Sequence, residues 1–238
     1  MQLSHTPRAI SAVFDDPNLV SAAGLVPIVA VAEQAGLRSL ADEHLSVPTD
    51  KGANAGLKVA SLVAGMVAGA DSIDDLGLLR HGGMGKVFER AYAPSTLGSF
   101  LRAFTFGHVR QLDAVASRFL TGLADQTHRG HAIIEQVNAD LKSSALAHLP
   151  SGTFWANAAW LVLAVIAFNL TRAAATLAGD TLSKATTPTI RRTLITVPAR
   201  IASTARRLIL HLPTTWPWDS AWTELFTRVC GPPRPTTT

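Results

Sequence analysis

The chain has 238 residues, which is enough for one large domain or two small ones with a substantial core. It is 47% hydrophobic and only 16% charged, and this balance excludes an intrinsically disordered chain. The single cysteine, Cys230, excludes an internal disulfide framework and a cysteine-rich zinc module. We therefore expect a folded chain that packing holds together.

The formal net charge of +4 is unevenly distributed along the chain. Residues 1–124 hold ten basic and eleven acidic side chains, whereas residues 172–238 hold nine basic and three acidic ones. An excess of positive charge in the last third predicts contact with a polyanion or with an anionic membrane surface. The amino terminus lacks a long apolar stretch followed by a small-residue cleavage site, so we expect no secretion.

Hydrophobic periodicity and capping signals predict a mainly helical fold with few strands. Pro27 fits the first turn of a helix that Gly36 ends, and Ser72 with Asp75 resembles a capping box. The expected helices cover residues 27–34, 37–45, 54–70, from 72 to before Gly82, from Pro94 onward, 109–123, 128–148 and 154–170. Strands are expected at 9–14, followed by a turn at 15–18, and at 193–197.

The densest group of polar side chains consists of His128, His131, Glu135 and Lys142, which lie along one stripe of a helix. Such a group could bind a divalent cation or a phosphate. It could equally form a solvated helix face with one histidine–glutamate pair, and the spacing alone favours this second interpretation.

A magnesium site would need further acids, and a cluster of aspartates could supply them. The cluster consists of Asp71, Asp74 and Asp75 at the start of an expected helix. Carboxylates at that position also stabilise the positive end of the helix dipole without any catalytic role, and we favour this capping role.

The run from Ala158 to Phe168 is unbroken by polar residues but only eleven residues long. Spanning a membrane takes about 20 predominantly apolar residues, so a buried core helix is favoured. An extended segment, 154–170, keeps a membrane anchor as an alternative, with the basic tail on its carboxyl side.

The segment from Thr181 to Trp218 contains no acidic residue. Its arginines could follow a phosphate backbone, and the tryptophans at 216, 218 and 222 could stack on bases. A solvated amphipathic helix is an equally good interpretation, in which the two arginine pairs align on one face. The candidate phosphate-contacting side chains are His131, Lys142, Arg191, Arg192, Arg200, Arg206 and Arg207.

Three blocks resemble the carboxyl-terminal signature of bacterial insertion-sequence DDE transposases, namely residues 128–137, 139–142 and 144–152. In that family the motif Tyr-x2-Arg-x3-Glu-x6-Lys lies on the last helix of an RNase H-like catalytic fold. Glu135 and Lys142 match the Glu-x6-Lys part, whereas His128 and His131 stand at the Tyr and Arg positions. The blocks 14–16, 70–76 and 80–85 are similar to the start of the same proteins.

The resemblance is interrupted where Arg118–Ala124 leads directly into Asp125–His128. At this point the family has a strand with the first catalytic Asp and then a long α/β segment with the second. We infer an internally deleted transposase with its joint near 124–127. The resemblance then implies a helical amino-terminal region (1–124, for DNA binding or dimerisation), the helices of a truncated RNase H-like domain with a basic tail (125–230), and a frayed end (231–238). Replacement of the lost acids by Asp71 or Asp113 is disfavoured because both lie on expected helices.

In the family, three carboxylates hold two Mg²⁺ ions that activate the attacking hydroxyl. Only Glu135 carries over as a metal ligand, so we expect no productive Mg²⁺ binding and no strand cleavage, while DNA binding survives. The implied partners are the terminal repeats of the element, a second copy or an intact transposase, and the implied location is the cytoplasm with the nucleoid. The alternatives are an active magnesium-dependent transposase completed by another chain, a small membrane protein and a remnant without a role.

Overall fold

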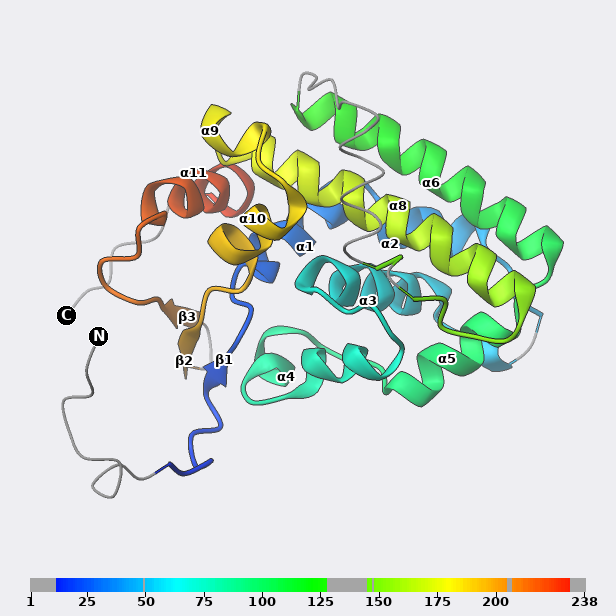
Figure 1. Ribbon diagram of the computed structural model, residues 1–238, viewed down its shortest axis with the longest axis horizontal. Coiled ribbons are helices and arrows are strands. Elements are labelled where there is room, and N and C mark those ends of the chain that lie inside the picture. The colour runs from blue at the N-terminus through cyan, green and yellow to red at the C-terminus, as the bar shows by residue number, and fades with distance from the viewer. Residues whose placement is uncertain (1–11, 49, 128–144, 147, 205–206, 232–238) are drawn as a thin grey trace.

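The computed structural model describes residues 12–48, 50–127, 145–146, 148–204 and 207–231, and within them the mainly helical fold is confirmed (Figure 1). Its α-helices are α1 (Leu25–Gln34), α2 (Leu37–His44), α3 (Ala55–Ala68), α4 (Met84–Val87), α5 (Pro94–Arg102), α6 (Phe106–Thr127), α8 (Phe154–Leu177), α9 (Asp180–Ser183), α10 (Thr187–Ile190) and α11 (Asp219–Cys230). The 3₁₀ helices η2 (Asp50–Gly52) and η3 (Asp74–Arg80), the π-helical turn η4 (Arg191–Ile195) and the strands β1 (Leu19–Val20), β2 (Ala199–Thr204) and β3 (Arg207–His211) complete the described elements.

Local signals placed the first helices correctly. The helix that contains Pro27 ends at Gln34, and Gly36 follows it with a φ of 80°, which a residue with a Cβ rarely adopts. The capping box is also confirmed, because the Asp75 carboxylate accepts hydrogen bonds from the Ser72 hydroxyl at 2.7 Å and from its backbone N–H at 3.1 Å. This capping box stands at the start of the 3₁₀ helix η3, which ends at Arg80, before the glycines at 82, 83 and 85.

The apolar run forms α8, which passes through the middle of the helical body between α3 and α6 (Figure 1). By length and composition α8 could cross a membrane, and it is the one such helix among the described residues. However, 72% of its most apolar window is buried inside the protein, as in the core helix of a globular protein. Trp160 and Leu163 are fully buried against this core.

The core is continuous from the amino-terminal helices to the carboxyl-terminal ones. Buried side chains of α1, α3 and α6 form one hydrophobic cluster with those of α8 and α11. The expected boundary between residues 124 and 125 falls within α6, which runs unbroken to Thr127. The proposed division into two regions therefore stays a prediction from the sequence.

Both strand predictions are wrong where the structure describes them. Residues 12–14 have no regular structure, and residues 9–11 lie outside the described part. Thr193, Leu194 and Ile195 are all buried in η4, and the Thr196 N–H donates to the Arg191 carbonyl at 2.8 Å. A half-buried strand would expose alternate residues, whereas these three consecutive residues are all buried because neighbouring helices such as α3 and α11 cover the turn.

The three strands form one small antiparallel sheet in the order β1–β2–β3. The turn expected at 15–18 lies at Pro17–Asn18, directly before β1. Strand β1 pairs Leu19 with Arg200, and β2 continues beyond it to pair with β3. The sheet thus joins two ends of the chain that are about 180 residues apart in sequence.

Candidate nucleic-acid interface

The four residues of the Glu-x6-Lys stripe, His128, His131, Glu135 and Lys142, lie outside the described residues, as do most of their predicted helix and Arg206. The described end of that helix differs from the prediction, because Ala145 and Leu146 form a turn. Among the described residues, no group of three or more His, Cys, Asp or Glu side chains is arranged to hold a metal ion. Because Glu135 lies outside this part of the chain, the expectation about Mg²⁺ binding stays a prediction from the sequence.

The aspartate cluster is divided between separate roles. Asp75 caps η3, and the hydrogen bond from the Ser72 hydroxyl lowers the pKa of its carboxyl group. Asp71 lies in the connection between α3 and η3, so its assignment to a helix is wrong, whereas Asp113 does lie on α6. The Asp71 carboxylate is 3.9 Å from His148 Nε2, which brings it beside the carboxyl end of the 128–148 segment.

Arg191 is half-buried and faces the protein. Its Nε–H donates to the carbonyl oxygen of Val67 at 3.3 Å, in the last turn of α3. Burial lowers the pKa of the Arg191 guanidinium, and the negative charge of Asp71 partly offsets this shift. A cation at the carboxyl end of a helix stabilises its unpaired carbonyl groups, so Arg191 connects η4 to α3.

Arg191→Gln should lower the free energy of unfolding by about 1–2 kcal/mol, because a buried hydrogen-bonded charge is lost. The matched variant Arg192→Gln should cost less than about 1 kcal/mol, since the Arg192 side chain is exposed and contacts only an aromatic ring in the described structure. Urea unfolding of the two variants measures the difference. Equal losses would contradict a structural role for Arg191.

Arg192 lies on the surface with its guanidinium carbon 5.8 Å from the centre of the Trp218 ring. Trp216 packs edge-on against Trp218 at 5.5 Å and donates its Nε1–H to the Thr193 carbonyl at 3.2 Å. Trp222 is only 6% exposed and stacks on a neighbouring ring, so it cannot stack on a base. Of the three tryptophans expected to meet nucleic acid, this one belongs to the core.

The two other candidate arginines that the structure describes, Arg200 and Arg207, lie on strands, so the interpretation that aligned the arginine pairs on one helix face is wrong. Arg200 is in β2, where its Nε is 3.1 Å from Asp16 Oδ2. Arg207 is exposed in β3 and has no acidic partner among the described residues. Sequence neighbours gave no sign of the Asp16 contact, because it joins residues 184 positions apart.

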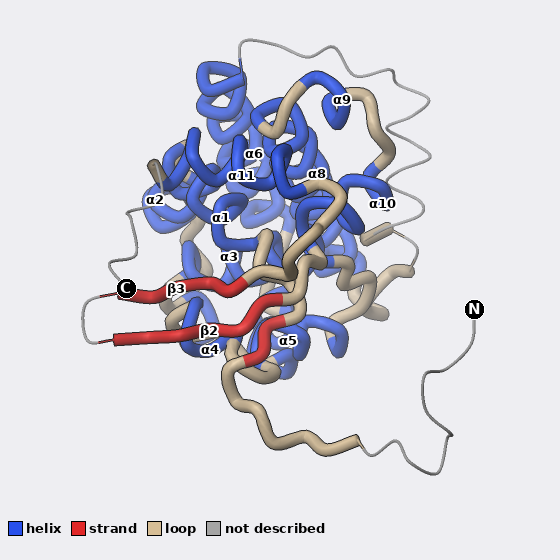
Figure 2. Tube along the Cα trace, turned by 90° about the vertical axis from the view of Figure 1, so that its left-hand side faces the viewer, coloured by secondary structure: helices blue, strands red, loops and turns tan. Residues whose placement is uncertain are grey.

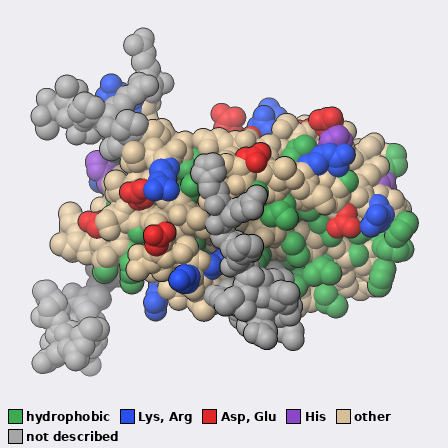
Figure 3. Space-filling view, turned by 90° about the horizontal axis from the view of Figure 1, so that it is seen from above, with side chains coloured by type: hydrophobic (Ala, Val, Ile, Leu, Met, Phe, Trp, Pro, Cys, Tyr) green, Lys and Arg blue, Asp and Glu red, His purple; other side chains and the backbone are tan. Residues whose placement is uncertain are grey.

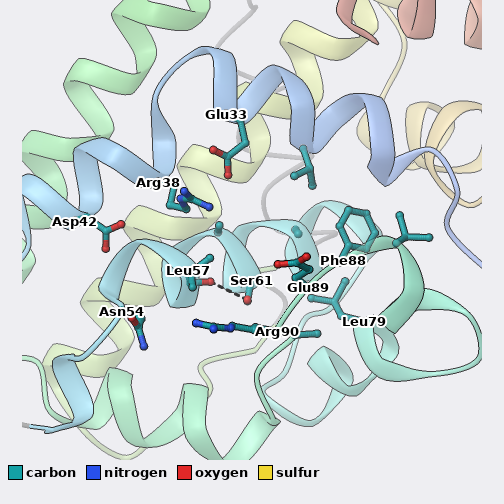
Figure 4. Close-up of a pocket in the computed structure, with 15 residues that line it drawn as sticks. Glu33, Arg38, Asp42, Asn54, Leu57, Ser61, Leu79, Phe88, Glu89 and Arg90 are labelled. Carbon is teal, nitrogen blue, oxygen red and sulfur yellow. Dashed lines mark hydrogen bonds between the residues drawn. The ribbon is translucent and has the colours of Figure 1, made fainter. Parts of the chain in front are cut away.

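A separate groove of about 470 Å³ lies between α1, α2, α3 and residues 87–91, and no sequence motif indicated it (Figure 4). Its floor is apolar and includes Leu57 and Leu79. Charged side chains of both signs surround this floor, namely Glu33, Arg38, Asp42, Glu89 and Arg90. Mixed charge of this kind does not favour a polyanion.

Hydrophobic side chains gather at the end of the molecule where α6 and α8 begin (Figure 3). Phe106 and Phe154 are 60% and 73% exposed, and both rings contact Trp155. Further along α8, Leu161 and Val165 are also exposed. An exposed group of large apolar side chains such as this one is a candidate contact surface for another protein chain.

Comparison with known proteins gives one match. Residues 121–231 match the family model of the transposase DDE domain, group 1. No curated protein and no solved structure matches the chain. The matched range contains Glu135, Lys142 and all five candidate arginines, and the carboxyl-terminal part of the chain is therefore similar to the DDE domain of transposases.

Proposed function

We propose that the chain is a transposase-type protein that binds DNA and has lost strand cleavage. The observation that carries this proposal is the match of residues 121–231 to the transposase DDE domain, which spans the Glu-x6-Lys residues and the basic segment. The match begins three residues before the joint that we inferred at 124–127. Within this proposal, the part of the domain that would carry the first two acids is absent.

DNA binding would depend on exposed positive charge rather than on one pocket. Arg192 and Arg207 are exposed, and among the described residues neither has an acidic partner. Contacts of arginine with phosphate supply affinity without sequence information, and they survive the loss of a catalytic site. Lys142 and the other candidate arginines would add to this surface.

Glu135 would remain as a metal ligand without its partners. A single carboxylate cannot hold the two magnesium ions that in-line attack on a phosphodiester needs. Within this proposal the partners are the terminal repeats of the element and either a second copy or an intact transposase, in the cytoplasm with the nucleoid.

The double variant Arg192→Gln with Arg207→Gln tests the DNA-binding surface. It should weaken duplex binding about 30-fold and make the slope of log K against log salt less negative by at least about one, because Arg192 loses a phosphate contact and Arg207 loses its own contact with the duplex. Fluorescence anisotropy with a labelled duplex measures both quantities.

A matched control removes the same charge elsewhere. Arg102→Gln with Arg118→Gln changes two exposed arginines of α5 and α6, far from the sheet in Figure 1, and should change affinity less than about twofold. Equal losses in both double variants would contradict the assigned surface, since only net charge would then matter.

A further inference from the structure

Strands β2 (Ala199–Thr204) and β3 (Arg207–His211) form an antiparallel pair, here called the hairpin, that extends away from the helical body (Figure 2). Its base is fixed, because Ala199 and Ile201 are each 4% exposed and the Ile201 N–H donates to the Asn18 carbonyl at 2.8 Å. Beyond Ile201 the described residues of both strands are exposed, except for Ile209, which is half-buried opposite Ala202. The hairpin is therefore a ribbon with a buried base and a free outer part.

The register separates two faces of this ribbon. Arg200 lies opposite His211, and Thr204 lies opposite Arg207. Side chains alternate along a strand, so these residues share one face, whereas Ile201 and Leu210 face the protein. The outer face thus carries positive charge at both ends, and Ala202 with its half-buried partner Ile209 lies between Arg200 and Arg207.

We propose that this hairpin enters the major groove of duplex DNA, an inference that rests on the DNA-binding function proposed above. A major groove about 12 Å wide and 8.5 Å deep admits a two-stranded β-ribbon. The exposed residues Ala202–Thr204 extend about 10 Å at 3.3 Å per residue, which is close to that depth. The small side chains of Ala202 and Thr204 let the backbone of β2 come near the bases.

The two arginines of the outer face then have different positions. Arg207 lies at the outer end, where it can reach base edges, and arginine pairs with guanine through the O6 and N7 acceptors of the major groove. Arg200 lies near the base of the ribbon, at the level of the phosphates. Charge complementarity with the phosphate backbone therefore favours a nucleic-acid duplex as the occupant of this face.

Asp16 holds Arg200 back from this contact. Its Oδ2 atom is 3.1 Å from Arg200 Nε, while its Oδ1 atom accepts a hydrogen bond from the Asn18 N–H at 2.9 Å. An exposed ion pair of this kind is weak and opens at little cost. The carboxylate thereby lowers the positive charge of the ribbon until a phosphate competes for the arginine.

Anisotropy titrations of two single variants and a control test the hairpin. Arg207→Gln should weaken duplex binding about fivefold or more, whereas Arg118→Gln on α6 should stay within about twofold. Asp16→Asn keeps the oxygen that accepts the Asn18 bond and removes the charge. It should tighten binding about threefold and steepen the salt slope by about one, because Arg200 gains a phosphate.

Two modified probes identify the groove. A duplex with glucosylated 5-hydroxymethylcytosine has sugars in its major groove and should bind at least about tenfold more weakly, whereas netropsin, a minor-groove ligand, should not compete. Unchanged binding by Arg207→Gln, or competition by netropsin, would overturn the hairpin inference while the DNA-binding proposal stands. Failure of the unmodified chain to bind any duplex would overturn both.

Discussion

Replacing Trp160 by alanine should lower the free energy of unfolding by about 3–5 kcal/mol. Trp160 lies in the second turn of α8, is fully buried, and donates its Nε1–H to the Ala145 carbonyl at 2.5 Å. The substitution leaves a large cavity where α8 meets the rest of the core and also leaves the carbonyl unpaired. Urea unfolding followed by circular dichroism measures the loss.

The neighbouring residue provides the control for this prediction. Leu161 is 47% exposed on the same helix, so Leu161→Ala should cost less than about 1 kcal/mol. Trp160→Phe keeps most of the packing and should cost about 1–2 kcal/mol through the lost hydrogen bond and the smaller ring. If Trp160→Ala were no more costly than Leu161→Ala, α8 would not be the core helix described above, and the membrane-anchor alternative would gain support.

The chain should show no Mg²⁺-dependent nicking of a duplex that carries the element's terminal repeat. Enzymes accelerate phosphodiester chemistry by many orders of magnitude, so the loss appears as absent product rather than as a slower rate. The physical reason is the missing ligand set: Glu135 alone cannot position two metal ions, and the described residues contain no cluster of acids that could. Gel analysis of the duplex after incubation with Mg²⁺ or with EDTA measures the amount of nicked product.

Glu135→Ala completes this test. It should leave DNA affinity unchanged or slightly tighter, because a carboxylate near phosphate is repulsive when no metal is bound. Nicking that needs Mg²⁺ and disappears in Glu135→Ala would contradict the loss of catalysis. Asp71→Asn would then be the next variant to assay, because the Asp71 carboxylate lies beside His148, at the end of the 128–148 segment that contains Glu135.

Helices with clear local signals could be predicted from the sequence. Pro27 and Gly36 marked the first helix, Ser72 and Asp75 marked the capping box, and Pro94 opened α5 at its observed position. These signals act within one or two turns, so they do not depend on the remainder of the fold.

The strands could not be predicted in the same way. A short run such as Thr193–Val197 is compatible with a buried helix turn or a strand, and the surrounding protein decides between them. The true hairpin at 199–211 exposes most of its outer residues, so it shows no alternation between apolar and polar side chains. Its pairing with β1 joins the two ends of the chain, which no local pattern reports.

The candidate site was predictable in its composition and not in its geometry. The basic segment is evident from its charge, and Arg192 and Arg207 are exposed. The sequence could not reveal that Arg191 binds α3 or that Asp16 faces Arg200, because both contacts join distant segments. Whether Glu135 and Lys142 act as the resemblance implies stays a prediction, since both lie outside the described residues.

The most direct measurement is a fluorescence anisotropy titration of the purified chain at low and physiological salt. One duplex carries the element's terminal repeat, and a scrambled duplex of the same composition shows whether binding is specific for the ends. Binding should weaken about 100-fold between about 50 and 200 mM salt, as expected for roughly four phosphate contacts. Absence of binding to either duplex at low salt would contradict the account and leave a folded remnant without a DNA-binding role.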